Sequence, residues 1–221
     1  MQMGRKQYAV FGLGKFGWSV AATLAQSGCE VLAVDKSRET VEAIADEVTC
    51  AVYADMTNPK AVQGLGLENI DVAVIALAED MEASIMGTLL VKEAGVPYIL
   101  AKAVNGLHAD ILKKIGADEV VYPEQDSGIR VARNLVSGGF EDLFSLSDTF
   151  SMVEMRIPGQ WDGKTLRELD LRDRYRINVV ALKENDEIRV DLHPDDRMRS
   201  AATMILIGNN IDLERMKDKL K

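Results

Sequence analysis

Apolar and polar residues alternate in blocks along the first 136 positions of the chain. Short apolar runs bounded by turn residues are typical of buried strands, and apolar residues three or four positions apart are typical of amphipathic helices. The first pattern predicts strands at residues 8–11, 31–35, 50–54, 72–76, 98–101 and 120–122. The second pattern predicts helices at residues 15–28, 37–48, 58–65, 81–94, 107–115 and 127–136.

This alternation predicts an α/β fold with a Rossmann-like doubly wound parallel sheet and right-handed crossovers. The pattern breaks at Ser137, Gly138 and Gly139, and residues 140–148 resemble a crossover in their mixture of apolar and acidic side chains. The sequence beyond this point predicts a small α+β module with strands at 150–157, 179–183, 187–191 and 204–208 and helices at 165–169 and 211–220. We therefore expect a Rossmann domain over residues 1–138, a linker over 139–148 and a C-terminal α+β domain over 149–221.

A glycine-rich turn joins the first predicted strand to the first predicted helix. Gly12 permits a tight turn, Gly14 lets the backbone approach a phosphate without a Cβ in the way, and Gly17 lets the helix lie close to the strand. A helix that starts near Lys15 presents unpaired N–H groups and the positive end of its dipole to a pyrophosphate. The turn predicts a phosphate site, and its structural alternative is a plain strand-to-helix loop.

An acid follows the second predicted strand at the position that a dinucleotide pocket requires. Asp35 lies about 20 residues after the turn, where a carboxylate can accept both hydroxyl groups of a ribose. Its charge would repel a 2′-phosphate and so disfavour NADP, although Lys36 and Arg38 lie close in sequence. Together with the glycine turn, this acid predicts a pocket for an adenine nucleotide.

Further candidates follow the other predicted strands. In an open parallel sheet the ligand lies beyond the carboxyl ends of the strands, at the point where the strand order reverses. Asp55 can bond to adenine N6 or to a ribose hydroxyl; alternatively it caps the next helix from a distance or is simply solvated. The predicted nucleotide-binding residues are Gly12, Leu13, Gly14, Lys15, Phe16, Gly17, Asp35, Lys36, Ala54, Asp55, Met56, Thr57, Ala76, Leu77, Ala78, Lys102 and Glu124.

Two charged residues in that set have specific expected roles. Lys102 ends the fifth strand and can neutralise a phosphate. Glu124 follows the sixth strand and can hold a divalent cation that bridges phosphates, since hard cations prefer carboxylate oxygens. The structural alternative is a surface salt bridge between the two side chains.

Composition limits the partners and the compartment. The chain has 221 residues, 47% of them hydrophobic, and a formal net charge of −9. Residues 149–221 carry 14 basic and 14 acidic residues, so all of the excess negative charge falls on residues 1–148 and argues against nucleic acid as a partner. No apolar run approaches the roughly 20 residues of a bilayer span, and we expect a soluble cytosolic protein.

Two classes of function remain. An NAD-dependent oxidoreductase is the alternative, but it would need a proton relay, and the chain has only two histidines. We expect His108 to cap a helix or face solvent, and His193 to lie in a turn before Pro194. A regulator needs only two states that differ in nucleotide affinity, which favours regulation over catalysis.

Several segments in combination resemble the KTN/RCK family, the cytosolic gating subunits of Ktr and Trk potassium transporters, and the similarity is closest to the Ktr-type subunit. The resemblance rests on the glycine turn, on Asp35, on residues 54–57, on Lys102 and on the small C-terminal module. Residues 115–118 (Ile-Gly-Ala-Asp) and 122–128 (Tyr-Pro-Glu-Gln-Asp-Ser-Gly) resemble the family's final Rossmann strand and crossover.

The resemblance implies dimers assembled into an octameric ring, bound at the cytoplasmic side of a membrane potassium-translocating subunit. ATP and ADP, or NAD and NADH, would bind competitively and change the shape of the ring, with Glu124 near a divalent cation. Close Ktr relatives typically have arginine where this chain has Lys15, which implies weaker discrimination between ATP and ADP. We expect subunit interfaces on the helix at 127–136 and on the cluster Leu143, Phe144 and Leu146.

The C-terminal module resembles a domain that in some members binds cyclic di-AMP between two subunits. By that pattern the candidate contacts are Arg172, Asn178 and Pro194, with Arg174 beside them. The alternative is that the acids interleaved with these arginines already satisfy them.

Overall fold

The structure is a computed structural model that describes residues 6–136, 140, 142–185 and 187–220. It divides into two compact units, Met1–Glu124 and Gln125–Lys221, which are considered separately below. Helix α6 (Pro123–Val136) starts at the end of the first unit and is grouped mainly with the second. The predicted break at residues 137–139 lies outside the described residues, and a domain boundary near residue 138 stays a prediction.

The first unit contains one six-stranded sheet in which every strand pair is parallel. The strand order is β3-β2-β1-β4-β5-β6, the doubly wound order in which the sheet changes direction between β1 and β4. The predicted Rossmann-like fold is therefore confirmed. The strands are β1 (Gln7–Phe11), β2 (Glu30–Asp35), β3 (Cys50–Tyr53), β4 (Val72–Ile75), β5 (Tyr98–Lys102) and β6 (Glu119–Val121).

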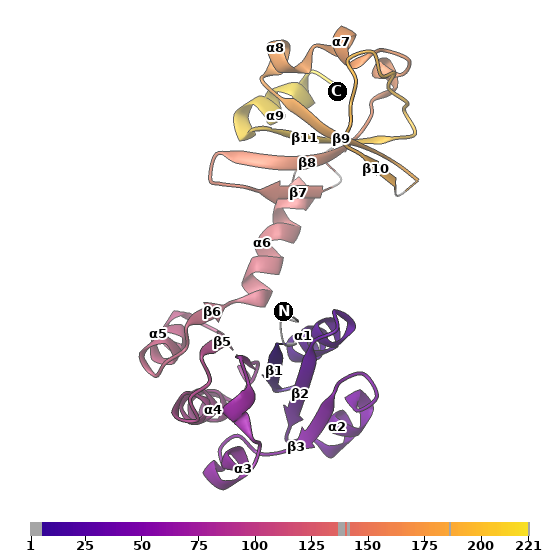
Figure 1. Cartoon of the computed structure of the whole chain (residues 1–221). Coiled ribbons are helices and arrows are strands. Elements are labelled where there is room, and N and C mark those ends of the chain that lie inside the picture. Colours follow the sequence, from indigo (N-terminus) through magenta and orange to yellow (C-terminus); the bar gives the residue numbers. More distant parts are fainter. Residues whose placement is uncertain (1–5, 137–139, 141, 186, 221) are drawn as a thin grey trace. The chain divides into compact units, whose positions relative to one another are not determined.

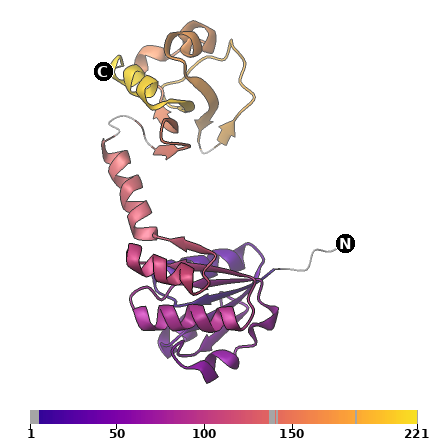
Figure 2. The same ribbon diagram turned by 90° about the vertical axis from the view of Figure 1, so that its left-hand side faces the viewer.

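Helices cover both faces of this sheet (Figure 1). One face packs against α1 and α2, and the other against α3, α4 and α5. Figure 2 views the first unit from the side of α4 and α5, which lie in front of the sheet. The helices are α1 (Lys15–Gln26), α2 (Arg38–Ile44), α3 (Pro59–Gln63), η1 (Leu67–Asn69), α4 (Met81–Glu93) and α5 (Gly106–Lys114).

Strand β1 shows why its sequence is continuously apolar. Ala9, Val10 and Phe11 are all fully buried. Successive side chains of a strand point to opposite faces. Ala9 and Phe11 accordingly join the core under α3, α4 and α5, and Val10 joins the core under α1 and α2. The part of a strand that is covered on both faces has no polar residue, and the one polar residue of β1, Gln7, is at its first position, where burial is only partial.

The second unit is built on a five-stranded antiparallel sheet of order β10-β9-β11-β8-β7. Its fully buried side chains include Val153, Ile177, Met204 and Leu206. The strands are β7 (Asp142–Ser145), β8 (Phe150–Arg156), β9 (Asn178–Glu184), β10 (Glu187–Arg189) and β11 (Thr203–Asn209). The helices besides α6 are η2 (Gly159–Trp161), α7 (Leu166–Leu169), α8 (Leu171–Tyr175) and α9 (Asn210–Asp218).

Three sequence-based expectations differ from the structure. Strand β7 lies within the stretch expected to be a linker, and helix α8 was not expected at all. His108 was expected to cap a helix or face solvent, but its side chain is completely buried, and Asn105 caps α5 instead by accepting the His108 N–H. This prediction was wrong because His108 lies on the same face of α5 as Leu112, four residues later, which is also fully buried.

Candidate functional site

A cavity of about 860 Å³ lies at the carboxyl ends of the strands in the first unit. Its lining comes from the segments that follow β1, β2 and β4 and from the ends of β5 and α6, so it lies at the topological switch point. The lining residues are Gly12, Gly14, Lys15, Phe16, Gly17, Asp35, Lys36, Ala76, Leu77, Glu79, Asp80, Met81, Lys102 and Glu124. Most of the residues predicted to bind a nucleotide are thus brought to one place.

The three glycines of the turn meet different surroundings. Gly12 has φ +89°, and a Cβ there would lie 2.8 Å from a Leu77 side-chain carbon. A Cβ on Gly17 would lie 1.8 Å from the Gly12 carbonyl oxygen, which no side chain can do. A Cβ on Gly14, in contrast, would meet nothing within 4 Å. Gly12 and Gly17 are therefore required by packing, and Gly14 leaves open space on the side of the cavity.

Gly14 also precedes the first residue of α1. It has an extended conformation (φ −65°, ψ −177°) and no side chain that could cap the helix. The N–H groups in the first turn of a helix have no partner within that helix. Because this helix has neither a side-chain cap nor an acid in its first turn, the arrangement suits an anionic group of a ligand.

Asp35 connects the two loops that border the cavity. Its Oδ2 accepts the Leu13 N–H at 2.7 Å, and its Oδ1 accepts the Ser37 N–H at 2.8 Å. Each carboxylate oxygen can accept more than one hydrogen bond, so both atoms keep capacity for a ribose hydroxyl. Leu13 does not line the cavity with its side chain, but its backbone holds Asp35 in place.

Lys102 and Glu124 form the ion pair that was the structural alternative to ligand binding. The Lys102 Nζ and Glu124 Oε1 atoms are 2.5 Å apart, and both residues line the cavity. The Lys102 side chain is only 12% exposed and its ammonium lies 5.9 Å from the centre of the Phe16 ring, whereas Glu124 is 71% exposed. Hydrogen bonding by Lys102 lowers the pKa of the Glu124 carboxyl group, which keeps it ionised. Lys102 is thus the better enclosed of the two charges.

A second ion pair, between Lys36 and Asp80, lies in the same lining. Lys36 Nζ and Asp80 Oδ2 are 2.7 Å apart. The hydrogen bond with Lys36 lowers the pKa of Asp80, and the bond with Asp80 raises the pKa of Lys36. Asp80 and Met81 were absent from the residues expected at the site, whereas Glu79 was a candidate because it follows the fourth predicted strand. The signal for Asp80 was present in the sequence, since it precedes the predicted helix at 81–94 and caps α4 by accepting the Ala83 N–H.

Six predicted residues do not line the cavity. Ala54, Met56 and Ala78 are buried in the core of the first unit. Asp55 accepts hydrogen bonds from the backbone N–H and the hydroxyl group of Thr57, which lower its pKa, and it does not cap α3, because Asn58 does. The residues outside the lining are Leu13, Ala54, Asp55, Met56, Thr57 and Ala78.

The candidate residues of the second unit lie in two places. Arg172 Nε donates to Asn178 Oδ1 at 2.8 Å, and the guanidinium of Arg174 lies 5.6 Å from the centre of the Tyr175 ring. Pro194 lies in the loop before β11, where its carbonyl oxygen accepts the Arg167 N–H. Arg172 and Asn178 are therefore brought together directly.

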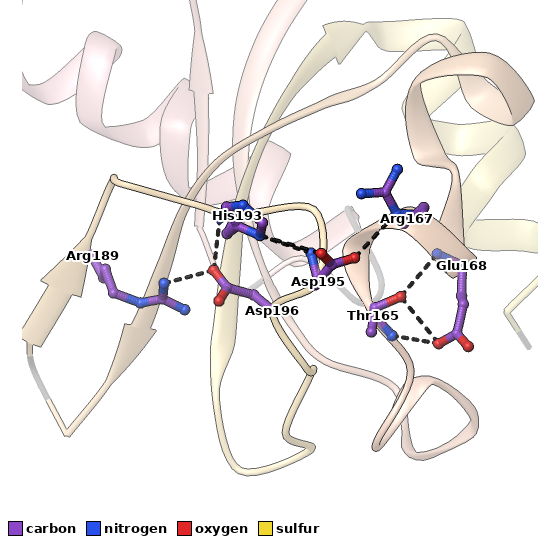
Figure 3. A network of polar contacts seen from close by, with 7 residues as sticks. All are labelled: Thr165, Arg167, Glu168, Arg189, His193, Asp195 and Asp196. Atoms are coloured by element: carbon purple, nitrogen blue, oxygen red, sulfur yellow. Dashed lines mark hydrogen bonds and ion pairs between the residues drawn. The ribbon is translucent and has the colours of Figure 1, made fainter.

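A network of charges connects α7 to the loop that contains Pro194 (Figure 3). Arg167 pairs with Asp195 at 3.1 Å, and Arg189 pairs with Asp196 at 2.6 Å. Thr165 caps α7 in a reciprocal arrangement with Glu168. The acids of these two ion pairs, Asp195 and Asp196, are not the acids interleaved with the arginines that the sequence offered as an alternative to phosphate binding.

The described residues contain neither a group of metal-binding side chains nor a helix that could span a membrane. No group of three or more His, Cys, Asp or Glu side chains in that part of the chain could hold a metal ion together. No helix among the same residues is long and apolar enough to cross a membrane. Glu124 therefore belongs to no such group of three among the described residues, and a cation there would need further oxygen ligands such as those of bound phosphates.

Comparison with known proteins gives two family-model matches. The TrkA-N domain matches residues 8–123 and the TrkA-C domain matches residues 152–221. The chain is 38% identical over 216 residues to Ktr system potassium uptake protein C of Bacillus subtilis (strain 168), covering 98% of both chains. It is 36% identical over 220 residues to Ktr system potassium uptake protein A of the same organism, covering 98% of this chain and 99% of the relative.

A solved structure agrees in fold. The crystal structure of the GsuK RCK domain superposes with a TM-score of 0.66 at 17% identity, covering all of this chain and 48% of the other. The sheet order and the two domain matches define a Rossmann-like TrkA-N domain followed by a TrkA-C domain. The chain belongs to the KTN/RCK family, among the relatives of the Ktr-system potassium uptake proteins.

Proposed function

We propose that this chain is the cytoplasmic regulatory subunit of a Ktr- or Trk-type potassium transporter, and that occupancy of its cavity by an adenine nucleotide is converted into a change of shape instead of chemical turnover. The observation that carries the proposal is the cavity itself, with open space at Gly14, an uncapped helix terminus and Asp35 on one rim. Similarity to Ktr-system proteins over nearly the full length of both chains supports the potassium transporter as partner.

The nucleotide would be ATP or ADP, with NAD or NADH as the second possibility. We propose that the first turn of α1 and Lys102 hold the phosphates and that Asp35 holds the ribose. A divalent cation would bridge Glu124 and phosphate oxygens. With lysine at position 15, a point charge in place of a planar guanidinium, we expect ATP and ADP to be bound with similar affinity.

Calorimetric titration of the full chain with ATP, ADP, NAD and NADH tests the proposal. Lys102→Gln removes the enclosed charge and is expected to weaken binding of all four nucleotides by roughly tenfold, since a hydrogen bond to a charged group contributes about 1.5–3 kcal/mol. Lys60→Gln, on α3 and outside the cavity lining, is the matched control. Absence of heat with every nucleotide, or steady production of NADH from an alcohol, would overturn the proposal.

We further propose that the subunit is a homo-oligomer, with dimers assembled into an octameric ring that is peripherally associated with the membrane through the transporter. Exposed apolar side chains support this, among them Ile129, Val131 and Leu135 on α6 and Phe144 and Leu146 nearby in sequence. Leu143, also expected at an interface, is outside the side chains that the structure describes. Sedimentation of a monomer, with and without ATP, would contradict the proposed ring.

Cyclic di-AMP binding by the second unit also stays a proposal. Arg172 and Asn178 form one joint polar surface, while Arg174 and Pro194 would have to contribute from beside it or from a second copy. Titration of the full chain with cyclic di-AMP is the test, and Arg172→Gln should abolish the heat. Arg167→Gln, whose partner is Asp195, controls for loss of one positive charge in the same unit.

A further inference from the structure

Lys36 lines the cavity and directly follows Asp35, the acid proposed to hold the ribose. Asp35 ends β2, and a ribose held by that carboxylate has its 2′-hydroxyl next to the residue that follows the strand. A cation in this position can accommodate the 2′-phosphate of NADP. From the sequence alone, the charge of Asp35 disfavours NADP-type nucleotides, whereas Lys36 and Arg38 close by in sequence are cations that could accommodate a 2′-phosphate.

The structure shows that Lys36 is already engaged by acids. Its ammonium is 2.7 Å from Asp80 Oδ2, and Asp55 and Asp35 contribute further negative charge around it. One ammonium thus faces three carboxylates, and a dianionic phosphate added there would meet an excess of negative charge. The positive charge of Lys36 is therefore already balanced by acidic side chains of the protein.

The second cation suggested by the sequence is placed elsewhere. The guanidinium carbon of Arg38 lies 4.9 Å from the centre of the Tyr53 ring, on the edge strand β3. Arg38 is not among the residues that line the cavity. Lys36 is therefore the cation next to Asp35 in the lining that could serve a 2′-phosphate.

Asp80 is itself fixed by a second contact. Its Oδ1 atom accepts the Ala83 N–H at 3.1 Å and caps α4, while Oδ2 receives Lys36. The cap fixes where the carboxylate lies, so the Lys36 ammonium is paired at the N-terminus of α4. Both residues line the cavity.

We infer that Asp80 sets the nucleotide selectivity of this cavity by engaging Lys36, so that the site takes adenine nucleotides with a free 2′-hydroxyl and rejects those with a 2′-phosphate. This inference rests on the proposed nucleotide-binding function and adds a residue to it. Because both side chains are partly exposed and such ion pairs contribute little, the change in selectivity on removing the pair is expected to be modest.

The test compares NADH with NADPH, and ADP with adenosine 2′,5′-bisphosphate, by calorimetric titration of the full chain. Asp80→Asn keeps a side-chain oxygen for the α4 cap and removes the charge that holds Lys36. This variant is expected to raise the affinity for NADPH relative to that for NADH by at least about fivefold, close to 1 kcal/mol. Asp80→Ser, which also retains a cap, provides a second variant in case the first does not fold.

Two controls distinguish the loss of the Lys36–Asp80 ion pair from the effect of removing any negative charge nearby. Glu82→Gln removes one negative charge from the same end of α4 outside the cavity lining, and should leave the NADH to NADPH ratio within about twofold. Lys36→Met combined with Asp80→Asn should abolish the gain in NADPH affinity. An unchanged ratio in both Asp80 variants, or a gain that survives Lys36→Met, would overturn the role of Asp80. Absence of any nucleotide binding by the wild type would instead overturn the proposed function.

Discussion

The cavity of the first unit and the arginine-rich surface of the second both carry many charged side chains, but the two sites differ in how these charges are arranged. In the first unit, the parallel sheet brings the ends of several strands to one edge, and backbone N–H groups and open space at Gly14 lie among the side chains. In the second unit, Arg167 and Arg189 are each paired with a nearby aspartate (Figure 3). A parallel sheet can produce a site by its topology alone, whereas charges on an antiparallel module pair locally unless a ligand or a second copy displaces them.

The largest effect on stability is expected from replacing Gly17, one of the two glycines that packing requires. Gly17→Ala places a Cβ 1.8 Å from the Gly12 carbonyl oxygen, so α1 must move away from β1. We expect a loss of at least about 3 kcal/mol in the free energy of unfolding of the first unit, as for other severe overpacking. Thermal unfolding followed by circular dichroism measures this, and a melting curve like that of the wild type would show that the glycine turn is less constrained than its geometry indicates.

The second largest effect is expected for Gly14 in the same turn, where a substitution should lower nucleotide affinity without lowering stability. Gly14→Ala adds a methyl group where nothing lies within 4 Å, at a φ of −65° that alanine adopts freely. We expect the free energy of unfolding to change by less than about 1 kcal/mol and ADP affinity to fall at least tenfold, about 1.4 kcal/mol. Cyclic di-AMP titration of the same variant is the control, because a site in the second unit should be unaffected. Unchanged ADP affinity would remove Gly14 from the phosphate site.

A smaller effect concerns the two histidines, one in each unit. His108 is fully buried, neither ring nitrogen has a hydrogen-bond partner among the residues that the structure describes, and burial lowers its pKa. The unfolded chain therefore binds a proton more readily than the folded one. The free energy of unfolding has its full value above about pH 6.5 and decreases as the pH falls toward the lowered pKa of His108. His108→Leu should raise the free energy of unfolding by about 1 kcal/mol at pH 7 and remove part of the acid sensitivity.

Urea unfolding at pH 7.5 and pH 5.5 checks this prediction, with His193→Leu as the exposed control from the second unit. Equal pH dependence of wild type and His108→Leu would mean that the ring is solvated in solution.

The smallest effect is expected in the paired network of the second unit. Asp195→Asn removes the partner of Arg167, and both side chains are more than half exposed. Pairs of this kind contribute little, so the free energy of unfolding should change by less than about 0.5 kcal/mol. Denaturant unfolding measures the change, and the first unit provides an internal reference. A loss above 1 kcal/mol would show that the network stabilises the loop at Pro194 more than its exposure suggests.

The contrast between the units also explains what the sequence could predict. The alternation of apolar runs and amphipathic segments was sufficient for the order of elements in the first unit, and the glycines with Asp35 were sufficient to locate the cavity, because topology then brings the strand ends together. Helix α8 was missed because it has only five residues, three of them charged, and its one apolar pair, Leu171 and Tyr175 four positions apart, is too short a pattern to predict a helix. The position of Asp80 before a predicted helix could indicate its capping role, but its pairing with Lys36 could not be predicted, because the two residues are 44 positions apart and tertiary pairs of this kind leave no local pattern.

One feature of the cavity has a mechanical consequence. The two oxygens of Asp35 accept N–H groups from the glycine turn and from the segment that leads into α2. In the proposed complex, a ribose hydroxyl that bonds to the same carboxylate would be coupled to the backbone of the glycine turn, where the diphosphate is expected. Under that proposal, the binding energies of the nucleoside and diphosphate parts of a ligand should not add as those of independent fragments.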